Sequence, residues 1–187
     1  MPVEIEAKMK VDDIEVIAKR LRARGAKEMG DFFEVNTFYD TEDRRLLAAD
    51  QGLRVRVSRN VVTGESVCVL THKGPGQHGP LKRREETEMR VADALEARAF
   101  IERLGFARTI SFEKKRHSWE LADCKVELDD VPLLGKFVEI EGPSEASVMK
   151  VRQTLELTER PLIKAGYIAM LSSYLQERGD HRAEVKF

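Results

Sequence analysis

The 187-residue sequence predicts one α+β domain, with about eight strands and three or four helices. Many short segments alternate apolar and charged residues, as β-strands do. Other segments place apolar residues at helical spacing behind a capping side chain. In addition, successive strands carry both acids and bases at every second position. A flat sheet would turn this charged face to water, whereas a closed or nearly closed barrel would turn it inward.

Composition limits the classes of function. The formal net charge is -1, although 35% of the residues are charged, so no overall field attracts nucleic acid or a membrane surface. The sequence has no apolar run of membrane-spanning length and no leader pattern, so we expect a cytoplasmic protein. Cys68 and Cys124 lack the spacing of a metal site, and free thiols fit them better than a disulfide.

The first ten residues form a strand with two different faces. Its apolar positions are Val3, Ile5, Ala7 and Met9. Its charged positions are Glu4, Glu6, Lys8 and Lys10. One strand of this kind is common on a protein surface, so a functional interpretation depends on later strands that repeat the same mixture of charges.

The first half of the chain continues with alternating elements. Asp12 or Asp13 caps the first helix, and Gly25 fits its end. The predicted elements are a helix to about residue 24, a strand over 35–40, a helical turn over 44–50, a strand over 53–57, a strand over 66–73 and a strand over 82–91. The intervening segment 74–80 is rich in glycine and proline but precedes no helix, so we expect a mobile connection and not a phosphate-binding loop.

The second half predicts helices at both ends of three strands. The elements are a helix from Asp93 to about Leu104, strands over 108–121, 124–129 and 137–141, a helix from Ser144 to about Leu157, and one or two helices over 158–176 with an interruption near Gly166. Residues 179–187 are polar, and we expect them to fray. The predicted domain therefore covers residues 1–178.

If the charged faces point into a barrel, the interior has to hold water and a ligand. Removing this many charges from water would cost several kcal/mol for each ion unless the ions are paired. Paired glutamates on the first and last strands offer the hard oxygen ligands that Mg²⁺ or Mn²⁺ prefers. Arginines and lysines from other strands suit the oxygens of a polyphosphate. Carboxylates, a divalent metal and converging bases together predict a polyphosphate site.

Several motifs, in order, resemble the CYTH superfamily, also called triphosphate tunnel metalloenzymes. The first is Glu4-Ile5-Glu6-Ala7-Lys8, which matches the signature Glu-x-Glu-x-Lys of that family. The later matching blocks are Tyr39-Asp40-Thr41, Gly52-Leu53-Arg54-Val55-Arg56, Leu70-Thr71-His72-Lys73-Gly74-Pro75, Arg84-Glu85-Glu86-Thr87-Glu88, Lys114-Lys115-Arg116, Glu127-Leu128-Asp129 and the segment from Leu134 to Glu141. The resemblance implies an eight-stranded antiparallel β-barrel, the triphosphate tunnel, with helices packed outside.

The resemblance also implies roles for individual residues. Metal ligands would be Glu4, Glu6, Glu139 and Glu141, with Glu86, Glu88 and Asp129 as further candidates. Triphosphate contacts would be Lys8, Arg54, Arg56, Lys73, Arg84 and Arg116, and strand alternation adds Lys82 and Lys114 as candidates. Candidate catalytic residues are Lys8, Lys73 and Tyr39. Strand alternation supports most of these positions. Lys73 rests on the resemblance alone, because it shares a strand face with two valines, and Lys115 is excluded because it lies on the opposite face from Lys114.

The leading functional prediction is a metal-dependent triphosphatase that acts on a small-molecule triphosphate. One alternative is a class IV adenylyl cyclase, which converts ATP to cyclic AMP and pyrophosphate. Some cyclases of the family carry a His-Phe pair before the signature strand, where this chain reads Met-Pro-Val. A second alternative is a non-catalytic module that binds ATP or polyphosphate. We expect no nucleic-acid or membrane partner, and a homodimer is an open prediction because dimers are common among relatives.

Overall fold

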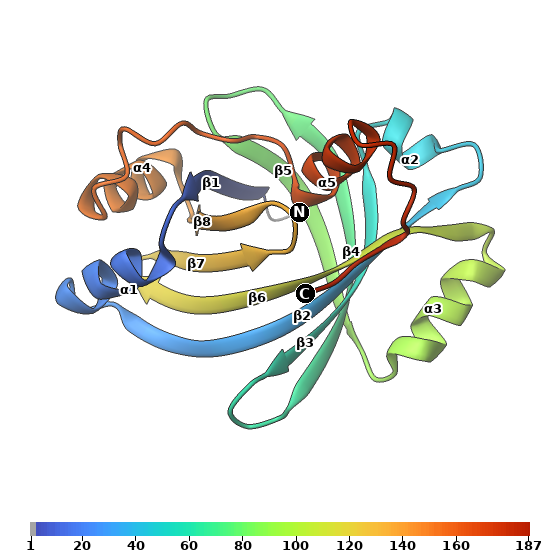
Figure 1. Cartoon of the computed structure of the whole chain (residues 1–187), viewed down its shortest axis with the longest axis horizontal. Coiled ribbons are helices and arrows are strands. Elements are labelled where there is room, and N and C mark those ends of the chain that lie inside the picture. The colour runs from blue at the N-terminus through green and yellow to red at the C-terminus, as the bar shows by residue number, and fades with distance from the viewer. Residues whose placement is uncertain (1–2) are drawn as a thin grey trace.

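The computed structural model describes residues 3–187, and in this range eight antiparallel strands close into a barrel (Figure 1). The strand order is β2-β3-β4-β5-β1-β8-β7-β6, and β6 pairs with β2 to complete the closure. The strands are β1 (Val3–Val11), β2 (Lys27–Thr41), β3 (Gly52–Asn60), β4 (Ser66–Gln77), β5 (Lys82–Val91), β6 (Phe106–Leu121), β7 (Cys124–Val131) and β8 (Gly135–Glu141). The predicted fold class is confirmed.

Strand β1 lies between β5 and β8 and pairs with both of them. Its first residues pair with β5, where Glu6 lies opposite Lys82. Its later residues pair with β8, where Glu6 lies opposite Glu141 and Lys8 opposite Glu139. Since alternate side chains of a barrel strand share a face, this register places the charges of three strands side by side on the inner wall.

Five helices lie outside the strands in the described part of the chain (Figure 1). They are α1 (Ile14–Ala23), α2 (Arg45–Ala48), α3 (Ala94–Arg103), α4 (Glu145–Thr154) and α5 (Tyr167–Gln176). The side chains of Asp13, Asp93 and Ser144 accept backbone N–H groups at the starts of α1, α3 and α4, as the sequence predicted.

The segment 158–166, predicted as helical, contains no helix. It runs instead along the barrel toward α5, and the Ile163 N–H donates to the carbonyl oxygen of Lys8 at 2.8 Å. A backbone bond to β1 replaces the intrahelical bonds that the sequence pattern suggested. As a result, the chain enters α5 directly beside the inner charges of β1.

Three apolar clusters hold the helices to the barrel. The largest joins the outer face of β1, β7 and β8 to α1 and α4, and it includes Met9, Leu21 and Val148. A second lies under α3 around Val55 and Ile101. The third packs α5 against inward-facing aromatic residues of the barrel, and its members include Phe38, Phe112, Phe137, Tyr167 and Leu171. The strand alternation therefore separates an apolar outer face from an inner face that is charged along much of its length.

Two strands extend beyond their predicted limits. Strand β2 begins at Lys27, well before residue 35, and contains a register shift near Gly30 that breaks the simple alternation. Strand β4 continues to Gln77 through half of the segment that was predicted to be a mobile connection. A register shift between Lys73 and Gly76 admits the glycines and the proline there.

The tail is also more ordered than predicted. Residues 179–187 were expected to fray, but Glu184–Val185 form the short strand β9, which pairs with Ser111 and Phe112 of β6. Val185 is buried in the α5 cluster. Strand β7 pairs with β6 only from Lys115 onward, so the edge of β6 before that residue is available to the tail.

Both cysteines are free, as predicted, and both are buried. Burial raises the pKa of the Cys124 thiol to about 11, and the nearby Asp123 carboxylate acts in the same direction. Within residues 3–187 no helix has the length and apolar character needed to cross a membrane.

Leu171 should be a main anchor of α5, because its side chain is 0% exposed within the third cluster. Leu171→Ala is expected to lower the free energy of unfolding by about 2–5 kcal/mol, as buried leucine truncations do. Leu95→Ala makes the same change on α3 at a residue that is 72% exposed. It should change stability by less than about 0.5 kcal/mol. Urea unfolding of both variants checks this, and similar losses in both would contradict the assigned packing of α5.

Candidate active site

The inner wall of the barrel and residues of α5 line a cavity of about 1580 Å³. This volume exceeds the roughly 300–1,000 Å³ of common ligand pockets. The predicted site residues that line the cavity are Glu4, Glu6, Lys8, Tyr39, Arg54, Arg56, Lys73, Lys82, Arg84, Glu86, Glu88, Lys114, Arg116, Glu139 and Glu141. The structure thus brings together residues from strands that are far apart in the sequence.

Lys8 lies at the centre of one wall and is 2% exposed. Its Nζ atom is 3.2 Å from Glu139 Oε1 and 3.6 Å from Glu6 Oε1. The same atom donates to the carbonyl oxygen of Ala165 at 3.0 Å and lies 4.1 Å from the centroid of the Tyr167 ring. Lys8 therefore connects the acids of β1 and β8 to the segment that leads into α5.

The two oxygens of Glu6 differ, because one accepts a hydrogen bond and the other has only an ion pair with Lys8 at 3.6 Å. Lys82 Nζ donates to Glu6 Oε2 at 3.0 Å. Glu6 Oε1 is buried and has no hydrogen-bond partner in the described structure. Burial would lower the pKa of Lys82, but the carboxylates of Glu6 and Glu4 outweigh it and raise that pKa above its usual range. The nearby Lys8 ammonium is 3.6 Å from Glu6 Oε1, beyond hydrogen-bond distance, so a cation at closer range would stabilise Glu6.

Glu4, Glu86 and Lys73 form a second group of ionisable residues. Burial raises the pKa of Glu4, and a hydrogen bond with Glu86 raises it further. Burial would also raise the pKa of Glu86, but the bond from Glu4 and the charge of Lys73 lower it. Lys73 Nζ donates to Glu86 Oε1. Burial, with the positive charge of Arg54, lowers the pKa of Lys73 to about 8. Lys73 can therefore change its protonation state near neutral pH.

Asp129 organises the bases on the adjacent wall. Its carboxylate accepts two hydrogen bonds from Arg116, at 2.7 and 2.6 Å. It also accepts from Lys114 Nζ at 3.2 Å and from the Tyr167 hydroxyl at 2.9 Å. Arg116 donates in addition to Glu139 at 2.5 Å. Asp129 was predicted as a further metal-ligand candidate, but both of its oxygens are taken by these donors and its side chain is fully buried. We therefore assign it to the positioning of Arg116 and Lys114.

The arginines of β3 form the opposite wall. Arg54 donates to Thr71 Oγ1 at 3.0 Å and contacts Glu88 at 3.3 Å. Arg56 donates to Asn36 Oδ1 at 2.8 Å. Burial lowers the pKa of Arg54 to about 10, and the charge of Arg56 contributes to this change. Arg54 Nε and Asn36 Nδ2 are buried and lack hydrogen-bond partners among residues 3–187. These two unpaired donors suit an anionic ligand.

Glu34 and Asn36 belong to the site although the sequence analysis did not select them. Glu34 lies 3.4 Å from Arg56 and 3.2 Å from Lys114, and so connects β2, β3 and β6. Burial would raise the pKa of Glu34, but these bases and Arg116 lower it well below its usual range. The predicted strand began at residue 35, one position after Glu34, so the prediction did not include Glu34 in the strand.

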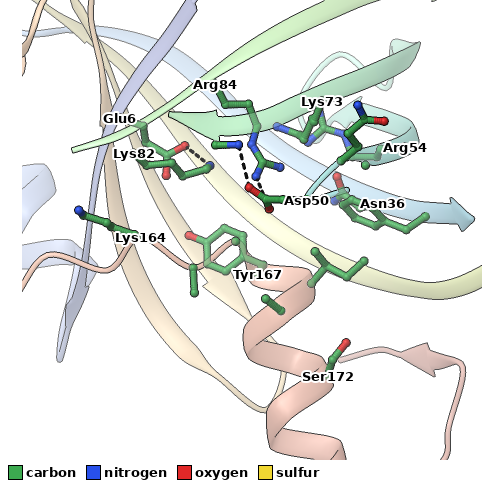
Figure 2. Close-up of a pocket in the computed structure, with 18 of the residues that line it drawn as sticks. Glu6, Asn36, Asp50, Arg54, Lys73, Lys82, Arg84, Lys164, Tyr167 and Ser172 are labelled. Atoms are coloured by element: carbon green, nitrogen blue, oxygen red, sulfur yellow. Dashed lines mark hydrogen bonds and ion pairs between the residues drawn. The ribbon is translucent and has the colours of Figure 1, made fainter. Parts of the chain in front are cut away.

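Arg84 shows a different kind of contact (Figure 2). Its Nη2 atom donates at 2.9 Å to Asp50 Oδ1, and the backbone N–H of Gly76 donates at 2.7 Å to Asp50 Oδ2. Asp50 lies between α2 and β3, and the sequence analysis gave it no role. The close-up shows its carboxylate pointing toward Arg84 in the cavity.

The strand face that contains Lys73 is the inner face. Thr71, on the same side of β4, donates to Glu88 Oε1 at 2.8 Å inside the barrel. Val67, which suggested an apolar face, is exposed toward the other end of the strand, near the hairpin. The alternation of β4 therefore agrees with the predicted inner position of Lys73, and Thr71 was the signal that could have shown this.

The tyrosine at the centre of the site is Tyr167, not Tyr39. Tyr39 borders the cavity but packs mainly in the outer cluster under α3, with Val55 and Ile101. Burial raises its pKa above the usual value. Its catalytic role stays a prediction. Tyr167 lies at the first position of α5. Its hydroxyl donates a hydrogen bond to Asp129, and its ring forms a cation–π contact with the Lys8 ammonium. Sequence alone gave no signal for it, because its position depends on the path of residues 158–166.

The acidic residues of β1 and β8 fit a divalent cation in chemistry, although their side chains are not gathered around one point. Among the described residues no three His, Cys, Asp or Glu side chains are close enough to hold a metal. However, Glu6 Oε1 accepts no hydrogen bond from the described residues, and Glu141 lies opposite Glu6 in the strand register. Burial raises the pKa of Glu141, and the negative charges of Glu4 and Glu6 add to this effect. A cation would relieve the repulsion between these carboxylates.

Comparison with known proteins agrees with this architecture. The CYTH domain model matches residues 2–166. A protein of Methanocaldococcus jannaschii named "Putative adenylate cyclase" is 25% identical over 177 residues, which cover 90% of this chain and 98% of that protein. The structure of the Pyrococcus horikoshii protein PH1819 has a TM-score of 0.80 and 26% identity, over 91% of this chain and 98% of that one.

A further solved structure, from Hippeastrum, shares the fold at 17% identity, with a TM-score of 0.67 over 92% of this chain and 96% of that one. It is named a putative adenylyl cyclase that reveals a dominant triphosphatase activity. The family model covers most of the sequence, and the charged barrel is the architecture that its motifs imply. This chain belongs to the CYTH family.

Proposed function

We propose that this protein is a metal-dependent triphosphatase that binds a small-molecule triphosphate inside the barrel. The observation that carries the proposal is a set of unsatisfied groups around one cavity. Buried nitrogen donors on Asn36, Arg54 and Arg84 lack hydrogen-bond partners in the described chain, and one carboxylate oxygen of Glu6 accepts no hydrogen bond there and lies 3.6 Å from Lys8 Nζ. Unsatisfied buried groups are costly, and a polyanion with an associated cation would satisfy both kinds.

The distribution of bases favours an extended polyanion over a single phosphate. Cationic side chains come from β1, β3, β4, β5 and β6, so they surround the cavity from several directions. Arginine can bond two oxygens of a phosphate at once, and lysine adds a point charge. A chain of three phosphates offers enough oxygens to reach bases on several walls. The proposed contacts are Lys8, Arg54, Arg56, Lys73, Lys82, Arg84, Lys114 and Arg116.

For the metal we propose Mg²⁺ or Mn²⁺, held by Glu6 and Glu141 with Glu4 and Glu139 nearby. When bound, such an ion would neutralise the negative charge that develops on the phosphoryl oxygens. Glu86 and Glu88 remain less direct candidates, because Glu86 bonds Lys73 and Glu88 contacts Arg54. Ligand chemistry supports this metal assignment, and so does the Glu6 oxygen that accepts no hydrogen bond in the described structure.

Lys8 and Lys73 would have different roles in the reaction. Lys8 is fixed by Glu139, Ala165 and Tyr167, so its ammonium group is suited to holding a phosphate in one position. Lys73 has a pKa of about 8 and is partly neutral near that pH. A bound polyanion would keep Lys73 in its charged form. We propose that its ammonium group then stabilises the negative charge that develops on the phosphoryl oxygens.

An adenylyl cyclase is the second candidate, and the name of the Methanocaldococcus jannaschii relative favours it. In a cyclase the nucleophile is the ribose 3′-hydroxyl, which attacks the α-phosphorus of ATP and releases pyrophosphate. The same bases and metal would serve both reactions, and the seating of the organic group would differ. A binding module without catalysis is less favoured, because carboxylates such as Glu6 would only repel an anion that was to be bound without a cation. Location in the cytoplasm and a homodimer remain predictions.

The products distinguish the candidates. Incubation with tripolyphosphate, thiamine triphosphate or ATP, with Mg²⁺ or Mn²⁺, should release orthophosphate. Cyclic AMP with pyrophosphate from ATP would identify the cyclase instead. Glu6→Gln should lower kcat/KM by about 100-fold in either case, because it removes a charged ligand from the metal position.

The matched control for this assay is Glu85→Gln, which makes the same chemical change on an exposed residue of β5. Its kcat/KM should equal that of the wild type. Full activity in Glu6→Gln would contradict the metal assignment. Absence of turnover with every substrate, together with tight binding that needs no metal, would favour the binding module.

The pKa of Lys73 predicts how binding depends on pH. Because this pKa is lowered to about 8, Lys73 loses its charge in the free protein as the pH rises through that value. Binding of tripolyphosphate then requires uptake of a proton, so affinity should fall by up to about tenfold per pH unit above pH ~8. Calorimetric titration between pH 7 and 9.5 measures this. Lys73→Met should bind more weakly and lose this slope, whereas Lys115→Met, on the outer face, should keep it.

A further inference from the structure

The carboxylate of Asp50, a residue of the protein itself, occupies a position at the cavity wall that would suit an anionic ligand. Asp50 accepts one hydrogen bond from the Gly76 N–H at 2.7 Å and another from Arg84 Nη2 at 2.9 Å (Figure 2). Two donors that converge on a carboxylate from different residues form an arrangement that also suits a phosphate oxygen. We call the Gly76 N–H and the Arg84 guanidinium together the β4–β5 anion seat.

The backbone of β4 is shaped for this contact. The pairing of β4 with β5 shifts register between Lys73 and Gly76 and resumes with Gly76 opposite Arg84, and the Gly76 N–H is directed at Asp50. A Cβ atom added at Gly76 would lie 3.0 Å from Asp50 Oδ2 and 3.7 Å from Arg84 Nη2. The glycine therefore leaves room for an anion at close range, which a side chain would fill.

The seat is more buried than the group that occupies it. The Arg84 side chain is 17% exposed, whereas the Asp50 side chain is 68% exposed. Arg84 Nε is also buried without a partner in the structure of residues 3–187, so Asp50 does not satisfy this guanidinium. Asp50 has a left-handed backbone, with φ of 51°, in the short connection between α2 and β3. An exposed carboxylate on a short connection can leave the seat at small cost, because water can solvate it.

We propose that the β4–β5 anion seat binds a phosphoryl group of the substrate and that Asp50 is an internal competitor that has to leave it. This inference rests on the proposed binding of a triphosphate in the cavity. The carboxylate and a phosphate cannot occupy the same donors, and at close range their like charges repel. Asp50 therefore lowers the affinity for polyanions. The Gly76 N–H is a substrate contact, and because it belongs to the backbone, no side chain in the sequence indicates it.

The test is calorimetric titration of tripolyphosphate into wild type and Asp50→Asn at fixed salt. Asparagine keeps the shape and tolerates the left-handed backbone, but it removes the competing charge. The dissociation constant of Asp50→Asn should be about 3- to 10-fold lower than that of the wild type, the effect expected for one partly exposed ion pair. Asp43→Asn neutralises an exposed carboxylate at the start of the α2 turn, paired there with Arg45, and should leave the dissociation constant unchanged.

A second readout places the ligand. In amide NMR spectra of the wild type, tripolyphosphate should shift the Gly76 N–H resonance, and orthophosphate should do so at higher concentration. An unchanged or weaker affinity in Asp50→Asn, or an unshifted Gly76 resonance at saturation, would overturn the inference while wild-type binding still supported the proposed function. Absence of binding in both wild type and Asp50→Asn would overturn the two together.

Discussion

The structure depends on one constraint: a closed barrel has to bury every second side chain of its strands, and here many of those side chains are ionised. Removing an ion from water costs several kcal/mol, so the inner charges must find partners. Much of the inner wall is accordingly a network of opposite charges, such as Lys8 with Glu139 at 3.2 Å and Lys114 with Asp129 at 3.2 Å. Some buried groups in this network, such as Arg54 Nε and Glu6 Oε1, have no hydrogen-bond partner in the described structure. These groups explain why the cavity is suited to a ligand that carries charges of both signs.

The same network ties the C-terminal part of the chain to the barrel interior. The Lys8 ammonium donates a hydrogen bond to the carbonyl oxygen of Ala165, just before α5. The Tyr167 hydroxyl, at the start of α5, donates one to Asp129. Leu171 and the aromatic residues around it then pack α5 over the apolar part of the inner face. The apolar core and the charged site are therefore not independent. A shift of α5 would move the tyrosine that orients the bases as well as the contacts that stabilise the fold.

Much of this site could be predicted from the sequence, because strand alternation is a local pattern. Glu4, Glu6, Lys8, Arg54 and Arg56 stand at alternate positions of clear strands, and the barrel places them as alternation requires. The roles of Tyr167 and Asp50 could not be predicted, since each depends on how a connecting segment crosses the barrel. The contribution of Gly76 is a backbone N–H, which has no signature in a pattern of side chains. Tyr39 borders the cavity and also packs under α3, and the sequence alone does not tell which of these environments decides its role.

The most direct test of a cation-bearing polyanion inside the barrel is a crystal structure of the protein with Mn²⁺ and tripolyphosphate, in which anomalous scattering locates the metal. This account predicts a manganese peak beside Glu6 and Glu141, and a chain of phosphates within the cavity between β1, β3 and β5. Manganese and phosphate found only on the outer surface, with the inner ion pairs unchanged, would contradict it.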